Sequence, residues 1–141
     1  MTYNWQKAID FVMKWEGGYV DDSNDPGGCT KYGISQRAYP SLNIETITPD
    51  EAKAIYKTDY WDKMNCDTLG YPYDIIVFDS AVNCGPQRAE MWLSESTHWA
   101  ELLMLRVFYY TTLAKKDKFR TFLRGWLNRT SDLFMLVRGN V

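Results

Sequence analysis

The sequence predicts a single, mainly α-helical domain with one small loop or β-hairpin near its N-terminus. Apolar residues recur at helical spacing through most of the chain, whereas residues 17–34 are rich in Gly and Asp. With 141 residues, of which 45% are hydrophobic and 24% charged, the chain is long enough to bury a core without disulfides. We therefore expect one domain over residues 1–141, in which residues 1–85 carry the loop and residues 86–141 form a C-terminal helical part.

The first helix is predicted over residues 3–16. Its apolar positions share one face at helical spacing: Trp5, Ile9, Val12 and Met13. Gly17 and Gly18 end this helix, because glycine is the residue most often found just past a helix C-terminus. The glycines further along residues 17–34 allow tight turns with positive φ, so a loop or a small hairpin is expected there.

The remaining helices follow from a cap and from apolar runs. A helix from Thr48 to about Met64 begins with a capping threonine, a proline in the first turn and Glu51 in the capping-box position. Residues 73–83 are apolar almost throughout, as is typical of the central helix of a bundle. Gly85-Pro86 ends that helix. Three more helices are then predicted, over residues 87–97, about 99–115 and about 119–138.

The residues with the clearest chemical meaning lie around the end of the first helix. Glu16 ends that helix, and the following loop supplies a second carboxylate, Asp25, and a hydroxyl, Thr30. Cleavage of a glycosidic bond needs such groups: an acid that protonates the leaving oxygen, and a group that handles water or the developing cation on the other face. The alternative is an ordinary helix C-cap followed by a solvated turn.

Four blocks of the sequence resemble the shared motifs of glycoside hydrolase family 108. They are, in order, Glu16-Gly17-Gly18-Tyr19 with its continuation to Ile34, Ala52 to Asp62, Phe78 to Gly85, and Phe122 to Arg129. The family comprises N-acetylmuramidases of phage lysis and of bacterial secretion systems. The resemblance implies a lysozyme-like helical fold. It also implies lysozyme-type cleavage of the β-1,4 bond between N-acetylmuramic acid and N-acetylglucosamine in peptidoglycan.

The spacing of Glu16, Asp25 and Thr30 is also similar to the Glu, Asp, Thr triad of phage lysozymes. Eight residues separate Glu16 from Asp25, as in that pattern, and four separate Asp25 from Thr30, one fewer than in it. By this likeness Glu16 is the general acid, Asp25 orients water or stabilises positive charge at the anomeric carbon, and Thr30 holds the water. The stereochemical outcome stays open, because carboxyl groups about 6.5–9.5 Å apart favour inversion and groups about 5–5.5 Å apart favour retention.

Three further residues are candidates for substrate binding: Tyr32, Asp79 and Asn83. An extended segment would put Tyr32 on the same face as Thr30, beside the sugar, and a core position is the alternative. Asp79 lies inside the apolar helix, where it either pairs with Arg106 or Arg129 for structure or contacts substrate. Asn83 either caps that helix or binds an N-acetyl group.

Charge and cysteine content limit the other classes of function. The net charge of −2 is not the strongly basic charge that is typical of nucleic-acid-binding proteins, so that class of function is not indicated. Residues 99–141 carry a net charge of +5 against −7 in residues 1–98, so the basic segment either contacts an anionic polymer such as peptidoglycan or docks on the acidic part of the chain.

The histidine, His98, is expected at the surface. Three cysteines, Cys29, Cys66 and Cys84, cannot all pair with one another, and without a predicted signal peptide reduced thiols are expected. The spacing of the cysteines matches no zinc site, and His98 is the histidine of the chain, so no metal or other cofactor is expected.

Neither a membrane span nor a signal peptide is predicted, because the chain has no stretch of about 18 apolar residues and no basic, apolar leader. The hypothesis is a monomeric endolysin that acts on peptidoglycan strands. The resemblance implies that it is made in the host bacterial cytoplasm and exported by a holin or a secretion channel to the periplasm and cell wall. The alternatives are a secretion-associated muramidase, a lytic transglycosylase, a non-catalytic wall-binding module, a structural protein of a secretion system, and activity on chitin.

Overall fold

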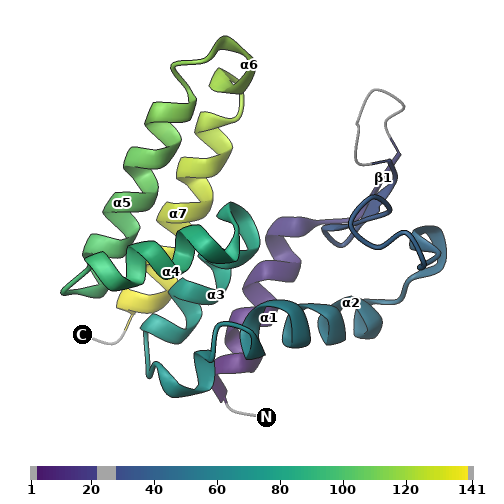
Figure 1. The fold of residues 1–141 in the computed structure, drawn as a ribbon, viewed down its shortest axis with the longest axis horizontal. Coiled ribbons are helices and arrows are strands. Elements are labelled where there is room, and N and C mark those ends of the chain that lie inside the picture. The colour runs from purple at the N-terminus through teal and green to yellow at the C-terminus, as the bar shows by residue number, and fades with distance from the viewer. Residues whose placement is uncertain (1–2, 22–27, 140–141) are drawn as a thin grey trace.

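The computed structural model describes residues 3–21 and 28–139, which are mainly helical (Figure 1). The α-helices are α1 (Tyr3–Glu16), α2 (Pro49–Tyr56), α3 (Tyr73–Cys84), α4 (Pro86–Glu95), α5 (Trp99–Leu113), α6 (Asp117–Arg120) and α7 (Leu123–Arg138). The shorter elements are the strands β1 (Tyr19–Val20), β2 (Thr30–Lys31) and β3 (Ile34–Ser35), and the non-α helices η1 (Ile44–Thr46), η2 (Lys57–Asp62) and η3 (Cys66–Thr68). The predicted mainly α fold with a small hairpin region is confirmed.

The small sheet follows directly on α1 and lies at one end of the molecule (Figure 1). Its described strands are antiparallel in the order β1-β2-β3, with Thr30 opposite Val20 on one side and opposite Ser35 on the other. Thr30 therefore occupies the middle strand. This arrangement brings the β2–β3 turn back toward the C-terminal end of α1.

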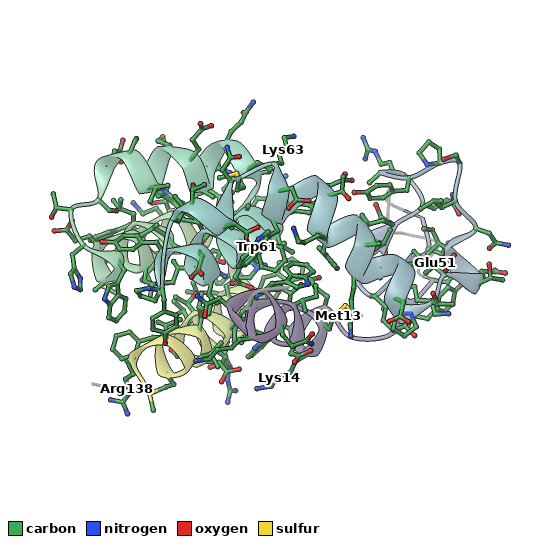
Figure 2. The ribbon with its side chains drawn as sticks, turned by 90° about the horizontal axis from the view of Figure 1, so that it is seen from below. Met13, Lys14, Glu51, Trp61, Lys63 and Arg138 are labelled. Atoms are coloured by element: carbon green, nitrogen blue, oxygen red, sulfur yellow. The ribbon has the colours of Figure 1, made fainter. Side chains whose placement is uncertain are left out.

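A continuous helical segment connects the sheet region to the core. The predicted capping box is present, since the Thr48 hydroxyl accepts from the backbone N–H of Glu51 at 3.2 Å, and the Glu51 carboxylate accepts from the backbone N–H of Thr48 at 2.8 Å. After α2 the helix widens to a π-helical turn, η2, and ends at Asp62 rather than near Met64. The wider turn places Trp61 in the interior, with no exposed surface (Figure 2).

The core is built around α3, as the apolar run predicts. Ile75, Ile76, Val77 and Phe78 are fully buried, and α3 is in contact with α1, α4, α5, η2 and η3. Trp5 of α1 and Trp61 of η2 both meet Phe78 edge-to-face, with ring centroids 5.5 Å apart in each pair. Such aromatic contacts add to the burial of large apolar area. They lock α1 and η2 onto the central helix, and so fix the position at which α1 ends.

The C-terminal part is a long hairpin in which α5 and α7 lie side by side and α6 forms the tip (Figure 1). The predicted helix over residues 119–138 is wrong at its start, because a turn at Thr121 and Phe122 separates α6 from α7. This break lets both Phe119 and Phe122 pack on Trp126, with ring centroids 6.3 and 5.8 Å away. His98 is an exposed N-cap of α5, as expected for a surface residue.

The three cysteines are free thiols. Burial raises the pKa of Cys66 to about 12, so this thiol stays protonated and unreactive near neutral pH. Within residues 3–21 and 28–139, no helix has the length and apolar character that a membrane crossing requires.

Candidate active site

The site begins where α1 ends. Glu16 is the last residue of α1, and the chain turns away at Gly17, which has a φ of 65°. A left-handed residue just past a helix is the usual stop, and glycine adopts it without strain. The Glu16 side chain is left 22% exposed, so its carboxylate is held by the protein and can still reach a ligand.

A turn of the sheet closes over this carboxylate. Tyr32 and Gly33 link β2 to β3, with φ values of 51° and 77°. Two successive residues of positive φ form the kind of turn that suits a tight hairpin. A Cβ atom added at Gly33 would lie 2.2 Å from the Tyr56 hydroxyl and 2.8 Å from Glu16 Oε2. Position 33 must therefore be glycine, both for its backbone and for the space beside Glu16.

Replacing Gly33 by alanine is expected to destabilise the fold by about 2–4 kcal/mol, from left-handed backbone strain together with overpacking. Wall-hydrolysing activity is expected to fall further than stability alone explains, because the new methyl group displaces Glu16. Urea unfolding and initial rates measure the two effects. The matched control is Gly70→Ala, since Gly70 has a similar φ of 72° but open space around it. Equal effects of the two substitutions on activity would contradict the close approach.

Arg129 of α7 clamps Glu16 from the other side. Its Nη1 donates to Glu16 Oε1 at 2.6 Å, while its Nε and Nη2 both donate to Asp79 Oδ1, at 3.1 and 2.7 Å. The second oxygen of Asp79 accepts from Arg106 Nη1 at 2.7 Å. Two carboxylates and two guanidiniums thus form one charge-balanced network from α1 through α3 to α5 and α7. Charge-assisted bonds of this kind fix geometry strongly.

The electrostatics of this network favour its charged form. Burial raises the pKa of Asp79, but the two arginines outweigh burial and hold that pKa below its usual value. For Arg129, burial lowers the pKa, and the charges of Asp79 and Glu16 more than reverse the effect. Asp79 is 1% exposed, and both of its oxygens are paired. Its position favours the structural alternative over the predicted contact with substrate.

The hydrogen-bond network around Asp79 also reaches Asn83, another residue predicted to bind substrate. Arg106 Nε donates to the Tyr110 hydroxyl at 2.8 Å, and that hydroxyl donates to Asn83 Oδ1. The Tyr110 ring stacks on Trp126 at 5.0 Å, which fixes the hydroxyl. Asn83 is half-buried near the C-terminal end of α3. Its amide nitrogen is the group that the predicted contact with an N-acetyl carbonyl would use, and this contact stays a prediction.

Tyrosines gather near Glu16. The Tyr56 hydroxyl donates to the Tyr32 backbone carbonyl at 2.8 Å, and its pKa is raised by burial and by the charge of Glu16. Burial also raises the pKa of Tyr60, as do the charges of Asp59 and Glu16. Glu16 therefore lies within electrostatic reach of both rings.

Tyr60 faces an open pocket of about 440 Å³, which we call the tyrosine pocket. It is lined by Tyr39, Thr58, Asp59, Tyr60, Lys63 and Pro86. The Tyr39 hydroxyl donates to Asp59 Oδ2 at 2.6 Å and so ties one wall together. Aromatic rings combined with a few fixed polar groups are typical of small-molecule sites, sugar sites among them.

The other residues predicted around Glu16 are placed as follows. Thr30 is half-buried in β2. Tyr32 is not in an extended segment with Thr30, because the chain turns at Tyr32, so the two side chains do not share a strand face. Asp25 lies outside the described residues, and the predicted Glu16–Asp25–Thr30 triad stays a prediction. In the described ranges, no cluster of three or more His, Cys, Asp or Glu side chains is arranged to hold a metal ion.

Two comparisons show what this chain is similar to. The family model described as glycosyl hydrolase 108 matches residues 9–85, more than half of the chain. The structure of Brucella abortus SagA is similar, with a TM-score of 0.75 and 28% sequence identity over 92% of this chain and 90% of that chain. Among curated proteins, no match to the chain is found. The family match includes Glu16 and Asp79.

Proposed function

Because the chain belongs to glycosyl hydrolase family 108, and is therefore a glycoside hydrolase, we propose that it hydrolyses the β-1,4 bond between N-acetylmuramic acid and N-acetylglucosamine in peptidoglycan. The observation that carries the proposal is the setting of Glu16. One oxygen is clamped by the buried Arg129, the other lies beside the Gly33 turn, and the side chain is partly exposed. A partly exposed carboxyl group whose orientation the protein fixes supports a role as general acid.

In the proposed reaction, Glu16 protonates the glycosidic oxygen as the bond to the anomeric carbon breaks. Oε1 accepts a hydrogen bond from Arg129, so the transferable proton belongs on Oε2, which lies on the Gly33 side. Asp25 orients or activates water, or stabilises positive charge at the anomeric carbon, and Thr30 holds the water. The rings of Tyr39 and Tyr60 supply apolar faces for a sugar in the tyrosine pocket.

The biological setting that we propose is lysis of the bacterial cell wall by a phage endolysin acting as a monomer. A holin or a secretion channel would move the protein from the host cytoplasm to the periplasm and wall. Residues 86–141 contribute to the same site, since α7 supplies the arginine that holds Glu16. We also propose that this C-terminal helical part contacts peptidoglycan, because the net charge of +5 in residues 99–141 suits an anionic polymer.

Mass spectrometry of the soluble fragments released from purified peptidoglycan tests the proposal. The wild-type protein is expected to release hydrated muropeptides with reducing muramic acid ends, and Glu16→Gln is expected to release them about 10²–10⁴-fold more slowly. Anhydro-muramic acid products would instead identify a lytic transglycosylase. Binding to the wall without any fragments would identify a binding module, and fragments with reducing N-acetylglucosamine ends would place the cleaved bond elsewhere.

A further inference from the structure

A second, larger pocket adjoins the tyrosine pocket. It has a volume of about 700 Å³ and lies between the end of η2 and the start of α4, and we call it the α4 pocket. The two pockets share Lys63 and Pro86 in their walls. A ligand in the tyrosine pocket could therefore extend past Pro86 into the α4 pocket. Its volume is within the range of pockets that hold small organic ligands.

The lining of the α4 pocket combines two cations with neutral hydrogen-bonding groups and apolar side chains. Lys63 is exposed, and its side chain projects outward from the surface (Figure 2). The guanidinium of Arg88 is held in place, since Nη1 donates to the Cys84 carbonyl at 3.1 Å and the group lies 4.0 Å from the centre of the Tyr109 ring. The neutral lining residues include Asn65, Gln87, Met64 and Met91.

Glu90 is the acidic residue among those that line this pocket. The pocket therefore offers two positive charges and one negative charge, separated by amide and apolar groups. A small inorganic anion would use only the cations and would leave the amides and methionines without a partner. A short peptide with several carboxylates, an amino group and alkyl side chains matches all of these groups.

We propose that the α4 pocket binds the acidic peptide that N-acetylmuramic acid carries in peptidoglycan. This inference rests on the proposed function, which places the glycan strand in the adjoining tyrosine pocket. The peptide branches from the sugar, passes Pro86 and presents its carboxylates to Lys63 and Arg88. Its alkyl groups contact Met64 and Met91, and Glu90 pairs with the amino group of a diamino acid. The protein thereby recognises peptide-bearing wall rather than bare glycan.

Methionine methyl resonances provide a direct test of binding that does not depend on catalysis. The probe is N-acetylmuramyl tripeptide ending in diaminopimelate, titrated into full-length Glu16→Gln protein that carries ¹³C-methyl methionine. The resonances of Met64 and Met91 are expected to shift. Those of Met104 and Met135 are internal controls that are expected to stay, because they line a separate pocket between α5 and α7.

Charge reversal identifies the group that binds the carboxylates. Lys63→Glu is expected to raise the Kd of the tripeptide, measured by the methyl shifts, by about five- to tenfold. This is the effect of losing one partly exposed ion pair and adding repulsion. Lys115→Glu is the matched control, since Lys115 is an exposed lysine outside both pockets. Absence of shifts at Met64 and Met91, equal shifts at all four methionines, or equal effects of the two lysine variants would each overturn the proposal.

Hydrolysis rates on substrates with and without the peptide distinguish peptide binding in the α4 pocket from the proposed cleavage of the glycan. Glu90 is exposed and lines the α4 pocket but not the tyrosine pocket. Glu90→Lys is expected to lower kcat/KM on peptide-bearing wall by about fivefold, the effect of losing one ion pair, and to leave the rate on amidase-treated, peptide-free glycan unchanged. Equal losses on both substrates would overturn peptide recognition. If the wild type cleaves neither substrate, the proposed function fails, and the methyl titration alone decides whether the α4 pocket binds the peptide.

Discussion

Glutamine in place of Glu16 is expected to lower the rate of wall hydrolysis by about 10²–10⁴-fold, the range that general acid catalysis contributes. The amide keeps the size of the side chain, and its carbonyl oxygen can still accept the hydrogen bond from Arg129 that now measures 2.6 Å. What it lacks is a proton acidic enough to give to the leaving oxygen. Arg129 also keeps its two bonds to Asp79, so the fold is expected to survive. Initial rates of fragment release and a urea unfolding curve measure the two effects.

Glu95→Gln is the matched control for this substitution. Glu95 is the exposed last residue of α4, as Glu16 is the last residue of α1, and the chemical change is the same. It is expected to leave the rate within about twofold of wild type, as for a residue outside the site. A Glu16→Gln protein that retains the wild-type rate would show that Glu16 is not the acid. An equal loss in Glu95→Gln would attribute the effect to net charge.

The helices were predictable because their signals are local. The capping box at Thr48 and the apolar run of α3 each act within a few residues, and both are present in the structure. The split between α6 and α7 was not predictable from periodicity. It depends on where Phe119 and Phe122 pack on Trp126, which is a tertiary contact that overrides the local pattern.

The candidate site was predictable only in part, for the same reason. The position of Glu16 at a helix end followed from Gly17, and its partner Arg129 is 113 residues away. Arg129 is a predicted partner of Asp79, but nothing local in the sequence indicates that its guanidinium reaches Glu16 as well. The turn at Tyr32 was missed because a bulky residue rarely adopts positive φ. The glycine that follows it was the available signal.

The buried network is expected to carry a large share of the stability. Asp79→Asn leaves Arg106, which is fully buried, without its carboxylate, and leaves Arg129 with Glu16 alone. Breaking a buried ion pair in this way costs about 3–5 kcal/mol, because an uncompensated charge stays inside the protein. Activity is expected to fall as well, since Arg129 then loses the contact that holds it beside Glu16. Urea unfolding at pH 7 and wall-hydrolysis rates measured under folding conditions provide the two measurements.

Asp74→Asn is the matched control in the same helix. Asp74 is 3% exposed, and it accepts hydrogen bonds from the Asn4 side chain and the Ile75 backbone N–H, both at 2.8 Å, in place of charged partners. An asparagine keeps one acceptor oxygen at that position, so we expect a cost of about 1 kcal/mol, that of a weakened hydrogen bond, and an unchanged rate. Equal costs for the two substitutions would show that pairing with arginine adds nothing specific at Asp79.

The pH dependence supplies an independent check on the charge of Asp79. Because the arginines hold its folded-state pKa below the usual value, the carboxylate contributes stability that is fully present above its unfolded pKa of about 3.9. That contribution is lost as the pH falls through the lower, folded-state pKa. The stability difference between wild type and Asp79→Asn is therefore expected to stay constant from neutral pH down to about pH 4 and to shrink below it. A difference that instead grows as the pH falls from 7 to about 5 would mean that the folded-state pKa of Asp79 is raised and that the arginines do not hold it in its charged form.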